Sequence, residues 1–557
     1  MTGLAIAMDL GTSGLRAQAL DLSSGEVLST VITTRHPLPG VNVIDHIHFA
    51  LELGVEAARD LMIQAVNQVI GQLRVTTDDV SRIAVCGNPV QLSLFQGIEV
   101  RDLAFAGSRK LNALGVVSPE RSAAIRFAAE FPGLDLAGQC AVIIPPAVRH
   151  EVGADALALV LQTGMLDRDE TAIAIDYGTN AEMALVHEGR VFTGSAAAGP
   201  ALEGQHITCG TLAMPGAIAD LEPVGAGHRL IVLGPEMVPV PGVQIDLRNA
   251  VDVAGATGPQ AFGITGTGTI AALDQAVEAG VVALPRIRTA DQRLHLGRDI
   301  FLTEADLAEA GKAIGAVRAG YFTLSAEAGI APGDIHTAYL AGASGTYVDA
   351  LKARRLGLVP PCAKTIRQVG NTSLAMAREL AVTPGRLEAM TDLARRLQQT
   401  HCMFGLSRTF ASVFLLELSY WTEGMPMSTY RELLRRHHLP DLPPVAGTPR
   451  VIRTVKQDVD DLGRKGLVTL ERVGVVAALP VDGCTGCLVC VGECPASALS
   501  VKMETEPPTI VLVHALCNGV ACRRCEPACP LKVFHLEAFF GSATRPESTE
   551  GSRMSRS

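Results

Sequence analysis

The stretch that decides the fold runs from Leu4 to Thr34 and reads LAIAMDLGTSGLRAQALDLSSGEVLSTVITT. Its segments LAIAMD, LRAQALDL and EVLSTVITT are rich in apolar residues and predict three short strands. Glycine and serine stand in the two joints, LGTSG and SSG, where they supply the permissive backbone that tight hairpins require. The stretch is therefore expected to form one strand–turn–strand–turn–strand unit.

The same pattern occurs a second time, from Thr171 to Ala196. There TAIAID, YGTN, AEMALVH, EG and RVFTGSA follow one another in the same order. The spacing from Asp9 to Asp176 equals the spacing from Thr12 to Thr179. Two related half-domains, each of which opens with such a unit, are the simplest explanation of the repeat. A single unit of this kind would not by itself indicate a fold.

The segments behind the two units predict an α/β fold with two lobes. Residues 49–73 have the apolar spacing of a helix that packs on a sheet, and residues 82–90 read as a buried strand. Thr303, followed by Asp306, resembles a capping box that opens a long alanine-rich helix. Residues 336–345 (HTAYLAGASG) predict a strand that runs into a glycine turn.

Each repeated unit places a carboxylate at a strand end, followed by a glycine and a hydroxyl in the turn, as DLGTS and DYGTN. Glycine lets backbone N–H groups approach phosphate oxygens, and the carboxylate can hold Mg²⁺ through water or orient an attacking water. Two facing turns would clamp a polyphosphate between the lobes, and two later glycine turns would add backbone contacts, the second near an adenosine. A purely structural hairpin is the alternative for any single turn. The predicted catalytic residues are Asp9 and Asp176, and the predicted nucleotide-binding residues are Gly11, Thr12, Ser13, Gly178, Thr179, Asn180, Gly266, Thr267, Gly268, Gly342, Ala343 and Gly345.

Eight of the 13 cysteines fall between residues 484 and 529 at metal-ligand spacing. CTGCLVCVGECP (484–495) is typical of bacterial ferredoxins, in which three closely spaced thiolates bind one 4Fe-4S cluster and the fourth cysteine points toward another. CRRCEPACP (522–530) repeats the second half of that run. We therefore predict two 4Fe-4S clusters, one held by Cys484, Cys487, Cys490 and Cys529, and the other by Cys494, Cys517, Cys522 and Cys525.

Two points leave alternatives to this assignment open. The spacer from Cys517 to Cys522 is longer than the usual two residues, which makes the ligand set of the second cluster less secure. A pair of zinc sites would also use CxxC pairs, although zinc requires neither the third cysteine nor the repeated Cys-Pro closure. The predicted role of the cysteine-rich segment is single-electron transfer at low potential.

Composition limits the classes of partner and the location. At 557 residues the chain should divide into about three or four domains. Charged residues make up 19% and the net charge is -10, so no basic surface for nucleic acid or anionic lipid is expected. The sequence contains no run of about 18 uncharged apolar residues that would span a bilayer and no signal-peptide pattern. A cytoplasmic protein that acts without nucleic acid or membrane is expected.

The paired turns, together with the GASG turn at 342–345, resemble the phosphate and adenosine motifs of the acetate kinase, sugar kinase, Hsp70 and actin superfamily. That resemblance implies duplicated ribonuclease-H-like lobes with ATP in the cleft between them. Longer runs are similar to the ATPase core of reductive activators of corrinoid proteins. These runs are IDYGTNAEMAL, AAAGPALEGQHITCG, ITGTGTIAALDQAVEAGVV, YLAGASGTYVDALKARRLGLVP and VGNTSLAMA.

The domain order narrows the resemblance. An ATPase core followed by a two-cluster ferredoxin-like domain is similar to the methylamine methyltransferase corrinoid protein reductive activases, over residues 1 to about 540. The implied activity is ATP-dependent reduction of an inactive Co(II) corrinoid to Co(I), and the implied partners are the corrinoid protein of a methyltransferase system and a low-potential electron donor. The expected domains are an N-terminal ATPase lobe (1–165), a C-terminal ATPase lobe with a helical extension (166–440), a linker (441–475), a small α+β ferredoxin-like domain (476–540) and a disordered tail (541–557).

Two other functions fit parts of this pattern. Activators of 2-hydroxyacyl-CoA dehydratases resemble the ATPase fold, but they hold one cluster at a dimer interface with cysteines inside the ATPase, a pattern that this chain lacks. A non-catalytic electron carrier with a nucleotide-sensing domain would not hydrolyse ATP. One residue and one segment each have two interpretations. Glu203 either assists water or Mg²⁺ or has a structural role. Residues 421–430 form either a docking surface or part of the core.

Overall fold

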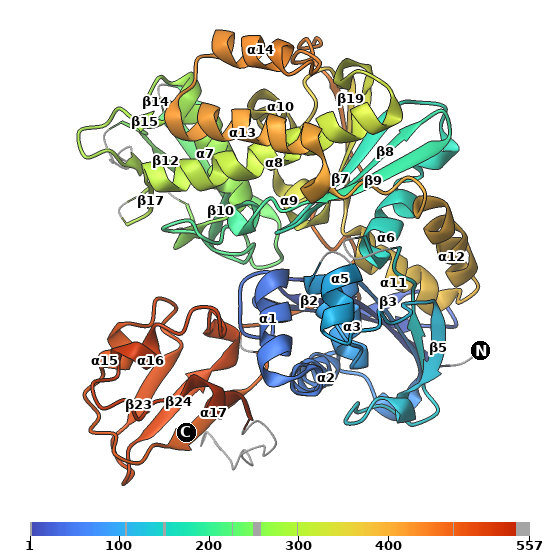
Figure 1. Ribbon diagram of the computed structural model, residues 1–557, viewed down its shortest axis with the longest axis vertical. Coiled ribbons are helices and arrows are strands. Elements are labelled where there is room, and N and C mark those ends of the chain that lie inside the picture. Colours follow the sequence, from blue (N-terminus) through green and yellow to red (C-terminus); the bar gives the residue numbers. More distant parts are fainter. Residues whose placement is uncertain are drawn as a thin grey trace. The chain divides into compact units, whose positions relative to one another are not determined.

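The computed structural model describes residues 3–105, 108–148, 152–225, 227–248, 258–297, 299–471 and 473–541 (Figure 1). Within these ranges the chain forms two compact units. The large unit comprises Met1–Thr34, Val69–Leu92 and Pro119–Glu471, and the small unit comprises Arg35–Gln68, Ser93–Ser118 and Arg472–Ser557. None of the helices in the described ranges combines the length and the apolar character that crossing a bilayer requires.

The first sheet of the large unit contains the first predicted strand unit. Its strand order is β21-β3-β2-β1-β4-β6-β5. β1 runs antiparallel to β2 and parallel to β4. The strands are β1 (Leu4–Leu10), β2 (Leu15–Asp21), β3 (Val27–Thr33), β4 (Val80–Gly87), β5 (Ala124–Phe127), β6 (Ala141–Ile144) and β21 (Leu467–Leu470).

The second sheet of the large unit contains the second predicted strand unit. Its order is β20-β19-β18-β7-β8-β9, and β7 is again antiparallel to β8 and parallel to β18. The strands are β7 (Ala172–Tyr177), β8 (Ala181–His187), β9 (Arg190–Ala196), β18 (Thr337–Ala341), β19 (Thr365–Gly370) and β20 (Arg450–Arg453). The series β3-β2-β1-β4 therefore matches β9-β8-β7-β18 in order and direction, which confirms the predicted duplication.

Helices and smaller sheets complete the large unit. The helices are α6 (Ala154–Thr163), α7 (Gly266–Glu278), α8 (Glu304–Ala328), α9 (Gly342–Tyr347), α10 (Ala350–Leu356), α11 (Thr372–Val382), α12 (Arg386–Leu397), α13 (Arg408–Glu423) and α14 (Met427–Arg436). A four-stranded sheet is formed by β10 (Ala217–Val224), β11 (Gly227–Leu233), β12 (Pro239–Ile245) and β13 (Gly263–Ile264). Two short ribbons are formed by β14 (Val282–Ala283) with β15 (Arg286–Ile287) and by β16 (Leu294–His295) with β17 (Phe301–Leu302).

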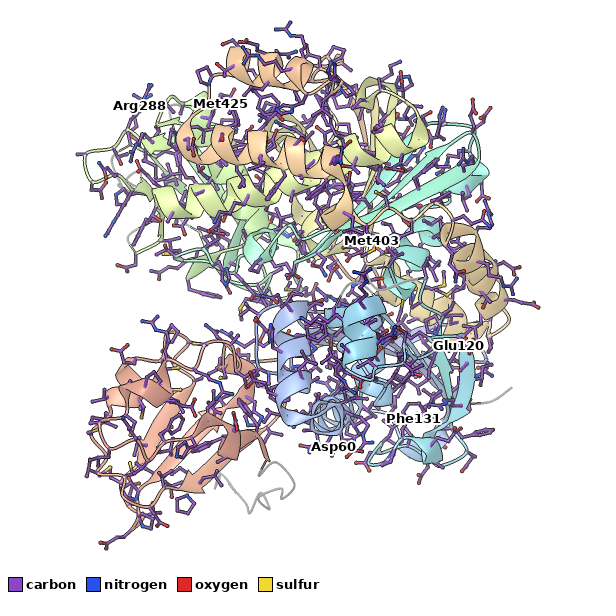
Figure 2. All side chains as sticks on the ribbon, in the orientation of Figure 1. Asp60, Glu120, Phe131, Arg288, Met403 and Met425 are labelled. Atoms are coloured by element: carbon purple, nitrogen blue, oxygen red, sulfur yellow. The ribbon has the colours of Figure 1, made fainter. Side chains whose placement is uncertain are left out.

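Helix α8 begins at the predicted capping box and packs along α13, and side chains fill the space between the two helices (Figure 2). The Arg318 guanidinium of α8 donates to Glu417 of α13 at 2.8 Å. Trp421 and Tyr430 donate to the same carboxylate at 3.1 and 2.5 Å, and both rings are buried. Trp421 and Tyr430 thus belong to the core, whereas the docking surface stays a prediction for the exposed residues between them.

Two expectations for the chain require correction. Residues 49–73 form two helices instead of one, α1 (Val43–Leu53) and α2 (Val55–Gln72), because Gly54 adopts a φ of 95° that ends α1. The predicted linker 441–475 is not a free connection, because it contributes β20 to the edge of one large sheet and β21 to the edge of the other. Both strands have only four residues, so their sequences carry little of the signal of a longer, central strand.

The small unit combines the cysteine-rich segment with residues from the N-terminal part of the chain. Its sheet is formed by β22 (Val476–Pro480), β24 (Thr509–Val513) and β23 (Leu499–Lys502), with α15 (Val489–Gly492), α16 (Cys525–Ala528) and α17 (Leu536–Gly541). The Phe49 ring of α1 meets Phe540 edge-on at 5.1 Å, and Glu52 pairs with Arg523. The Gly40 N–H donates to the Cys517 carbonyl at 2.8 Å. Residues 35–68 therefore pack with the cysteine-rich segment, although the sequence predicted an N-terminal lobe that is continuous from residue 1 to 165. The remaining helices are α3 (Pro89–Gln96), α4 (Arg101–Ala104) and α5 (Ser108–Ala113).

Candidate functional site

The two predicted turns lie at equivalent ends of the two duplicated hairpins. The first turn connects β1 to β2, and the second connects β7 to β8. Asp9 and Asp176 each stand one residue before the end of their strand. Across the hairpin, Asp9 pairs in register with Arg16, whereas Asp176 pairs with Glu182.

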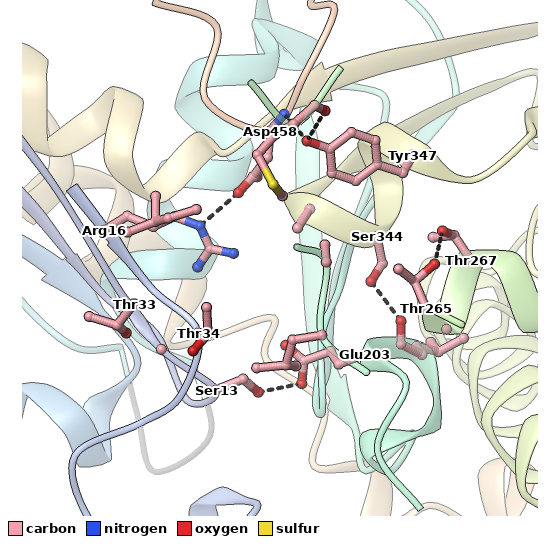
Figure 3. A pocket seen from close by; sticks show the side chains of 18 residues that line it. Ser13, Arg16, Thr33, Thr34, Glu203, Thr265, Thr267, Ser344, Tyr347 and Asp458 are labelled. Carbon is pink, nitrogen blue, oxygen red and sulfur yellow. Dashed lines mark hydrogen bonds and ion pairs between the residues drawn. The ribbon is translucent and has the colours of Figure 1, made fainter. Parts of the chain in front are cut away.

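Both turns line one cavity of about 640 Å³, which we call the acidic cavity. Residues 9–12 and 176–180 contribute to its wall, together with the amides of Asn88 and Asn371. Its lining carboxylates are those of Asp9, Asp155, Asp176, Glu182 and Glu203. A second cavity of about 640 Å³ shares Arg16, Glu203 and Ala343 with it. We call the second one the hydroxyl cavity, because Ser13, Thr33, Thr34, Thr265, Thr267 and Ser344 line it (Figure 3).

Burial and mutual repulsion raise the pKa values of four carboxyls of the acidic cavity, those of Asp9, Asp155, Asp176 and Glu182. Burial raises the pKa of Asp176 to about 8, and the charges of Asp155, Asp9 and Asp458 add to that effect. Burial likewise raises the pKa of Asp155 to about 6. The pKa of Asp9 is raised by burial too, but Arg16 and the Asn371 amide, which donates to Asp9 at 2.8 Å, oppose the shift. A cation placed in this cavity would be stabilised, because it would relieve the repulsion among the carboxylates.

Glu203 connects the two turns. Its Oε2 atom accepts from the Ser13 hydroxyl of the first turn at 2.6 Å and also from the Thr179 hydroxyl of the second turn. One carboxylate thus holds a hydroxyl from each half of the duplicated fold. Both hydroxyls are available to phosphate oxygens once they leave Glu203, because a hydroxyl can rotate to a new acceptor.

Arg16 supplies positive charge to both cavities. Among the described residues that line them, it is the only lysine, arginine or histidine. Its Nε atom lies 2.7 Å from Asp458 Oδ2, and its Nη1 atom lies 3.8 Å from Asp9 Oδ2. Figure 3 shows Arg16 and Asp458 facing each other at one side of the hydroxyl cavity.

The far wall of the hydroxyl cavity is the start of α7. Thr265 is the N-cap, and its hydroxyl accepts from the Gly268 N–H at 3.0 Å. Beside Thr265, Ser344 donates to the Leu202 carbonyl at 2.7 Å (Figure 3). Apolar side chains, including Leu202 and Met237, line the same cavity beside the Tyr347 ring. This mixture of a flat aromatic ring, apolar contacts and a few hydroxyls is typical of small-molecule sites.

The structure brings most of the predicted nucleotide residues together, but two of them line neither cavity. Twelve predicted positions lie at the two cavities: Asp9, Gly11, Thr12, Asp176, Gly178, Thr179, Asn180, Gly342 and Ala343 at the acidic cavity, and Ser13, Gly266 and Thr267 at the hydroxyl cavity. Gly268 instead packs on β10, where a Cβ atom would stand 2.3 Å from the Ile218 carbonyl oxygen. Gly345 packs on β18, where a Cβ atom would stand 2.9 Å from the Leu340 carbonyl carbon. Both glycines thus permit close packing of backbone, at the start of α7 and in α9.

Gly342 has a specific steric role at the acidic cavity. Its φ is 76°, and a Cβ atom there would stand 2.2 Å from Asp176 Oδ1. Any larger residue would displace the Asp176 carboxylate and strain the backbone. The GASG turn therefore fixes the position of the Asp176 side chain in addition to lining the cavity.

Sequence reasoning missed several residues of the site. Arg16 and Glu182 could have been found, because counting across each predicted hairpin from the aspartate leads to them. Asn88, Asp155, Asn371 and Asp458 come from separate segments that only the tertiary fold brings to the turns.

The cysteines of the small unit surround two separate cavities. Cys484, Cys487, Cys490 and Cys529 line a cavity of about 380 Å³, and Cys494, Cys517, Cys522 and Cys525 line another of about 330 Å³. These are the two sets of four that the crossed ferredoxin pattern predicts. In the ranges that the structure describes, no three histidine, cysteine or acidic side chains converge as ligands of one ion. Four thiols around a cavity fit a polynuclear cluster better than a single zinc ion.

The two cysteine cavities differ in their surroundings. Cys487 is exposed, and Leu488, Met503 and Leu531 near it are more than half exposed. At the other cavity, Cys517 is joined through its carbonyl to Gly40, and Gly519 lies against Pro39. The set that includes Cys487 is therefore the more open to solvent within the small unit.

Comparison with known proteins gives the family. Residues 170–431 match the family described as the C-terminal domain of RACo, the ASKHA domain, and residues 4–168 match the RACo middle region. The chain is 46% identical over 497 residues to the [Co(II) methylated amine-specific corrinoid protein] reductase of Methanosarcina barkeri, covering 89% of this chain and 92% of that protein. It is 26% identical over 402 residues to the corrinoid activation enzyme RamQ of Eubacterium limosum, covering 66% and 62% of the two chains.

A solved structure supports the same assignment. The reductive activator for corrinoid, iron-sulfur protein superposes with a TM-score of 0.62 at 26% identity, over 75% of this chain and 66% of that one. Three findings agree on the family. The family descriptions together span residues 4–431, the chain is 46% identical to the M. barkeri reductase, and the large unit has the duplicated ATPase fold. The chain belongs to the family of reductive activators of corrinoid proteins.

Proposed function

We propose that this protein reduces an inactive Co(II) corrinoid, held on a partner protein of a methyltransferase system, to Co(I) at the expense of ATP. The observation that carries the proposal is the joining in one chain of an ASKHA nucleotide fold and eight cysteines in two sets of four. The relative that is 46% identical is named for reduction of the same kind of protein, one specific for methylated amines. The partner is therefore a corrinoid protein, and the reductant is a low-potential electron donor.

The two cavities of the large unit accommodate the parts of ATP. The turns from Gly11 and Gly178 offer backbone N–H groups and hydroxyls to phosphate oxygens. The hydroxyl cavity, with the Tyr347 ring and its apolar wall, accommodates the adenosine. Asp9 and Asp176 are the catalytic carboxylates of this proposal, since both face the acidic cavity at the ends of their strands.

Magnesium fits the acidic cavity as a companion of the phosphates. Mg²⁺ usually keeps several waters and is held by one or two carboxylates and the phosphates of its substrate, instead of by an all-protein cage. This preference agrees with the wall of the acidic cavity. Its described carboxylates are close enough to repel one another, but they do not converge as ligands of one ion. Asp176 would gain from the ion, because no cationic side chain forms an ion pair with it among the described residues.

The cysteine sets fit two 4Fe-4S clusters, which when bound pass single electrons at low potential. The chain's own part is to hold four thiolates around each cavity and to leave one set open to a redox partner. Reduction of Co(II) is unfavourable for ordinary donors, and about 59 mV changes a one-electron equilibrium tenfold. Nucleotide binding and hydrolysis can favour such a transfer by binding one conformation of the protein better than another.

The experiment that tests this proposal compares two substitutions with the unsubstituted protein under anaerobic conditions. Asp176→Ala should abolish ATP hydrolysis and keep about eight iron atoms per chain, four for each set of cysteines. Cys490→Ser should lower the iron content and keep ATP hydrolysis. Cys402→Ser is the matched control, because Cys402 lies in the large unit and belongs to neither set. Stoichiometric zinc with no iron after anaerobic reconstitution would refute the clusters, and unchanged hydrolysis in Asp176→Ala would remove Asp176 from the site.

A further inference from the structure

Residues 450–471, which we call the strap, connect the two large sheets of the large unit. At its start, β20 pairs with β19, and at its end β21 pairs with β3. Beyond Glu471 the chain continues into the cysteine-rich segment. The strap is therefore the only stretch of the described chain that joins an edge of each large sheet and leads directly to the cysteines.

Asp458, in the middle of the strap, contacts residues that line the two cavities in three ways. Its Oδ2 atom accepts from Arg16 Nε at 2.7 Å. Its N–H donates to the Tyr347 hydroxyl at 3.3 Å, and its carbonyl accepts from the Asn371 N–H at 3.2 Å. Asn371 in turn donates to Asp9. The side chain of Asp458 is buried, and its Oδ1 atom has no hydrogen-bond partner among the described residues, so Arg16 alone compensates its charge there.

Arg16 has two competing acceptors in this arrangement. It lines both cavities, and a triphosphate placed across them would bring several negative charges within its reach. Arginine presents five N–H donors in a rigid fork and binds carboxylates and phosphates with similar geometry. Because the cavities have no other cationic side chain among their described lining residues, the phosphates and Asp458 would draw on the same guanidinium.

We propose that nucleotide binding shifts Arg16 from Asp458 to the phosphates and thereby loosens the strap that leads to the cysteines. The proposal rests on ATP as the ligand of the two cavities. A carboxylate left buried without its partner is strongly unfavourable, so Asp458 must move toward water when Arg16 leaves it. The strap is anchored on either side of Asp458. Before it, the Thr454 N–H donates to the Gln368 carbonyl at 3.0 Å, and after it, Gln18 donates to the Asp461 carbonyl. The loosened stretch is therefore residues 455–460.

Linkage makes the proposal quantitative. If ATP weakens the contact between Arg16 and Asp458, that contact must weaken ATP binding by the same factor. Asp458→Asn removes the competing charge and leaves the backbone N–H and carbonyl groups of residue 458 unaltered, so the dissociation constant of ATP should fall about fivefold or more. Asp460→Asn is the matched control, because Asp460 lies in the strap, is exposed and lines neither cavity.

The test uses the full chain with ATP titrations and amide hydrogen exchange. In the unsubstituted protein ATP should speed exchange in residues 455–460. In Asp458→Asn that exchange should be fast before ATP is added and should not change with ATP, while Asp460→Asn should behave like the unsubstituted protein. Arg16→Gln should weaken ATP binding and should also remove the response of the strap to ATP.

Three results would contradict the inference, and each would contradict a different step of it. ATP that binds without changing exchange in the strap overturns the coupling and leaves the ATP site intact. Equal or weaker ATP binding by Asp458→Asn, in a protein with unchanged thermal unfolding, overturns the competition for Arg16. No ATP binding by the unsubstituted protein would refute the proposed nucleotide site itself, and the inference with it.

Discussion

The β1–β2 hairpin and the β7–β8 hairpin place their aspartates at matching positions, but the residues that face the aspartates differ. Asp9 faces Arg16, whereas Asp176 faces Glu182. The turns also differ in length, since Leu10 pairs with Leu15 in the first hairpin and Tyr177 pairs with Ala181 in the second. The duplicated fold therefore carries a cation beside one aspartate and a second carboxylic acid beside the other.

This difference gives the two halves separate tasks. The first hairpin offers its own positive charge, which can meet phosphate directly. The second hairpin has carboxylates that burial and repulsion keep from ionising, so it favours a bound cation. Duplication alone would have produced two equivalent phosphate turns. The two turns are unequal because a different residue faces the aspartate in each hairpin.

The largest expected effect is a difference in the rate of ATP hydrolysis between variants of the two aspartates. Asp176→Asn should lower the rate of ATP hydrolysis about 100-fold or more, because it removes the carboxylate that would orient water or hold Mg²⁺. Asp9→Asn should have a smaller effect, since Arg16 remains. Asp169→Asn, in the exposed turn before β7, serves as the control and should hydrolyse ATP at the unsubstituted rate. Equal losses for Asp9→Asn and Asp176→Asn would show that the hairpins are equivalent.

The next effect is on the pH dependence of binding. Because the pKa of Asp176 is about 8, its carboxyl holds a proton at pH 7 in the absence of ligand. Binding of Mg²⁺ with ATP should displace that proton, so affinity should increase up to about tenfold per pH unit below pH 8 and level off above it. Titration calorimetry in two buffers with different ionisation enthalpies measures the proton released. Binding without proton release at pH 7 would contradict protonation of Asp176.

A smaller effect tests the source of the raised pKa. After burial itself, Asp155 is the largest contributor to the pKa of Asp176. Asp155→Asn should therefore move the midpoint of the pH dependence downward, by about half a unit to one unit. The same titrations repeated on this variant give the midpoint. An unchanged midpoint would show that the charge of Asp155 does not contribute to the raised pKa of Asp176.

The smallest expected effect concerns the hydroxyls held by Glu203. Ser13→Ala and Thr179→Ala each remove one hydroxyl from a phosphate turn, and each should raise the KM for ATP about two- to fivefold, the effect of one modest hydrogen bond. Steady-state kinetics checks both variants. A loss of more than a hundredfold in kcat for either one would give that hydroxyl a catalytic role.

Local patterns in the sequence predicted the parts of the fold that depend on neighbouring residues. The two hairpins, the capping box at Thr303 and the two sets of cysteines follow from short spacings. The partners of the aspartates across the hairpins were also within reach, because the register of a hairpin follows from its turn. These features agree with the structure because strand pairing, capping and turn geometry act over a few residues.

Contacts between distant segments could not be predicted in this way. Asn371 and Asp458 reach the site from the C-terminal half of the large unit, and nothing in their local sequences marks them. The strands of the strap are edge strands of only four residues each, which are too short to give a strand pattern in the sequence. The packing of α1 with the cysteine-rich segment depends on Phe49 and Glu52, residues that a surface helix of either lobe would also carry.

The most direct test of the proposed function measures the oxidation state of cobalt. Full-length protein, a Co(II) corrinoid protein and a low-potential reductant are mixed without oxygen, and visible absorption distinguishes Co(II) from Co(I). We expect Co(I) to form only when ATP is present, and we expect Asp176→Asn, with its iron retained, to form none with or without ATP. Formation of Co(I) at the same rate in the absence of ATP would contradict the coupling of nucleotide to electron transfer and would make the protein a simple electron carrier.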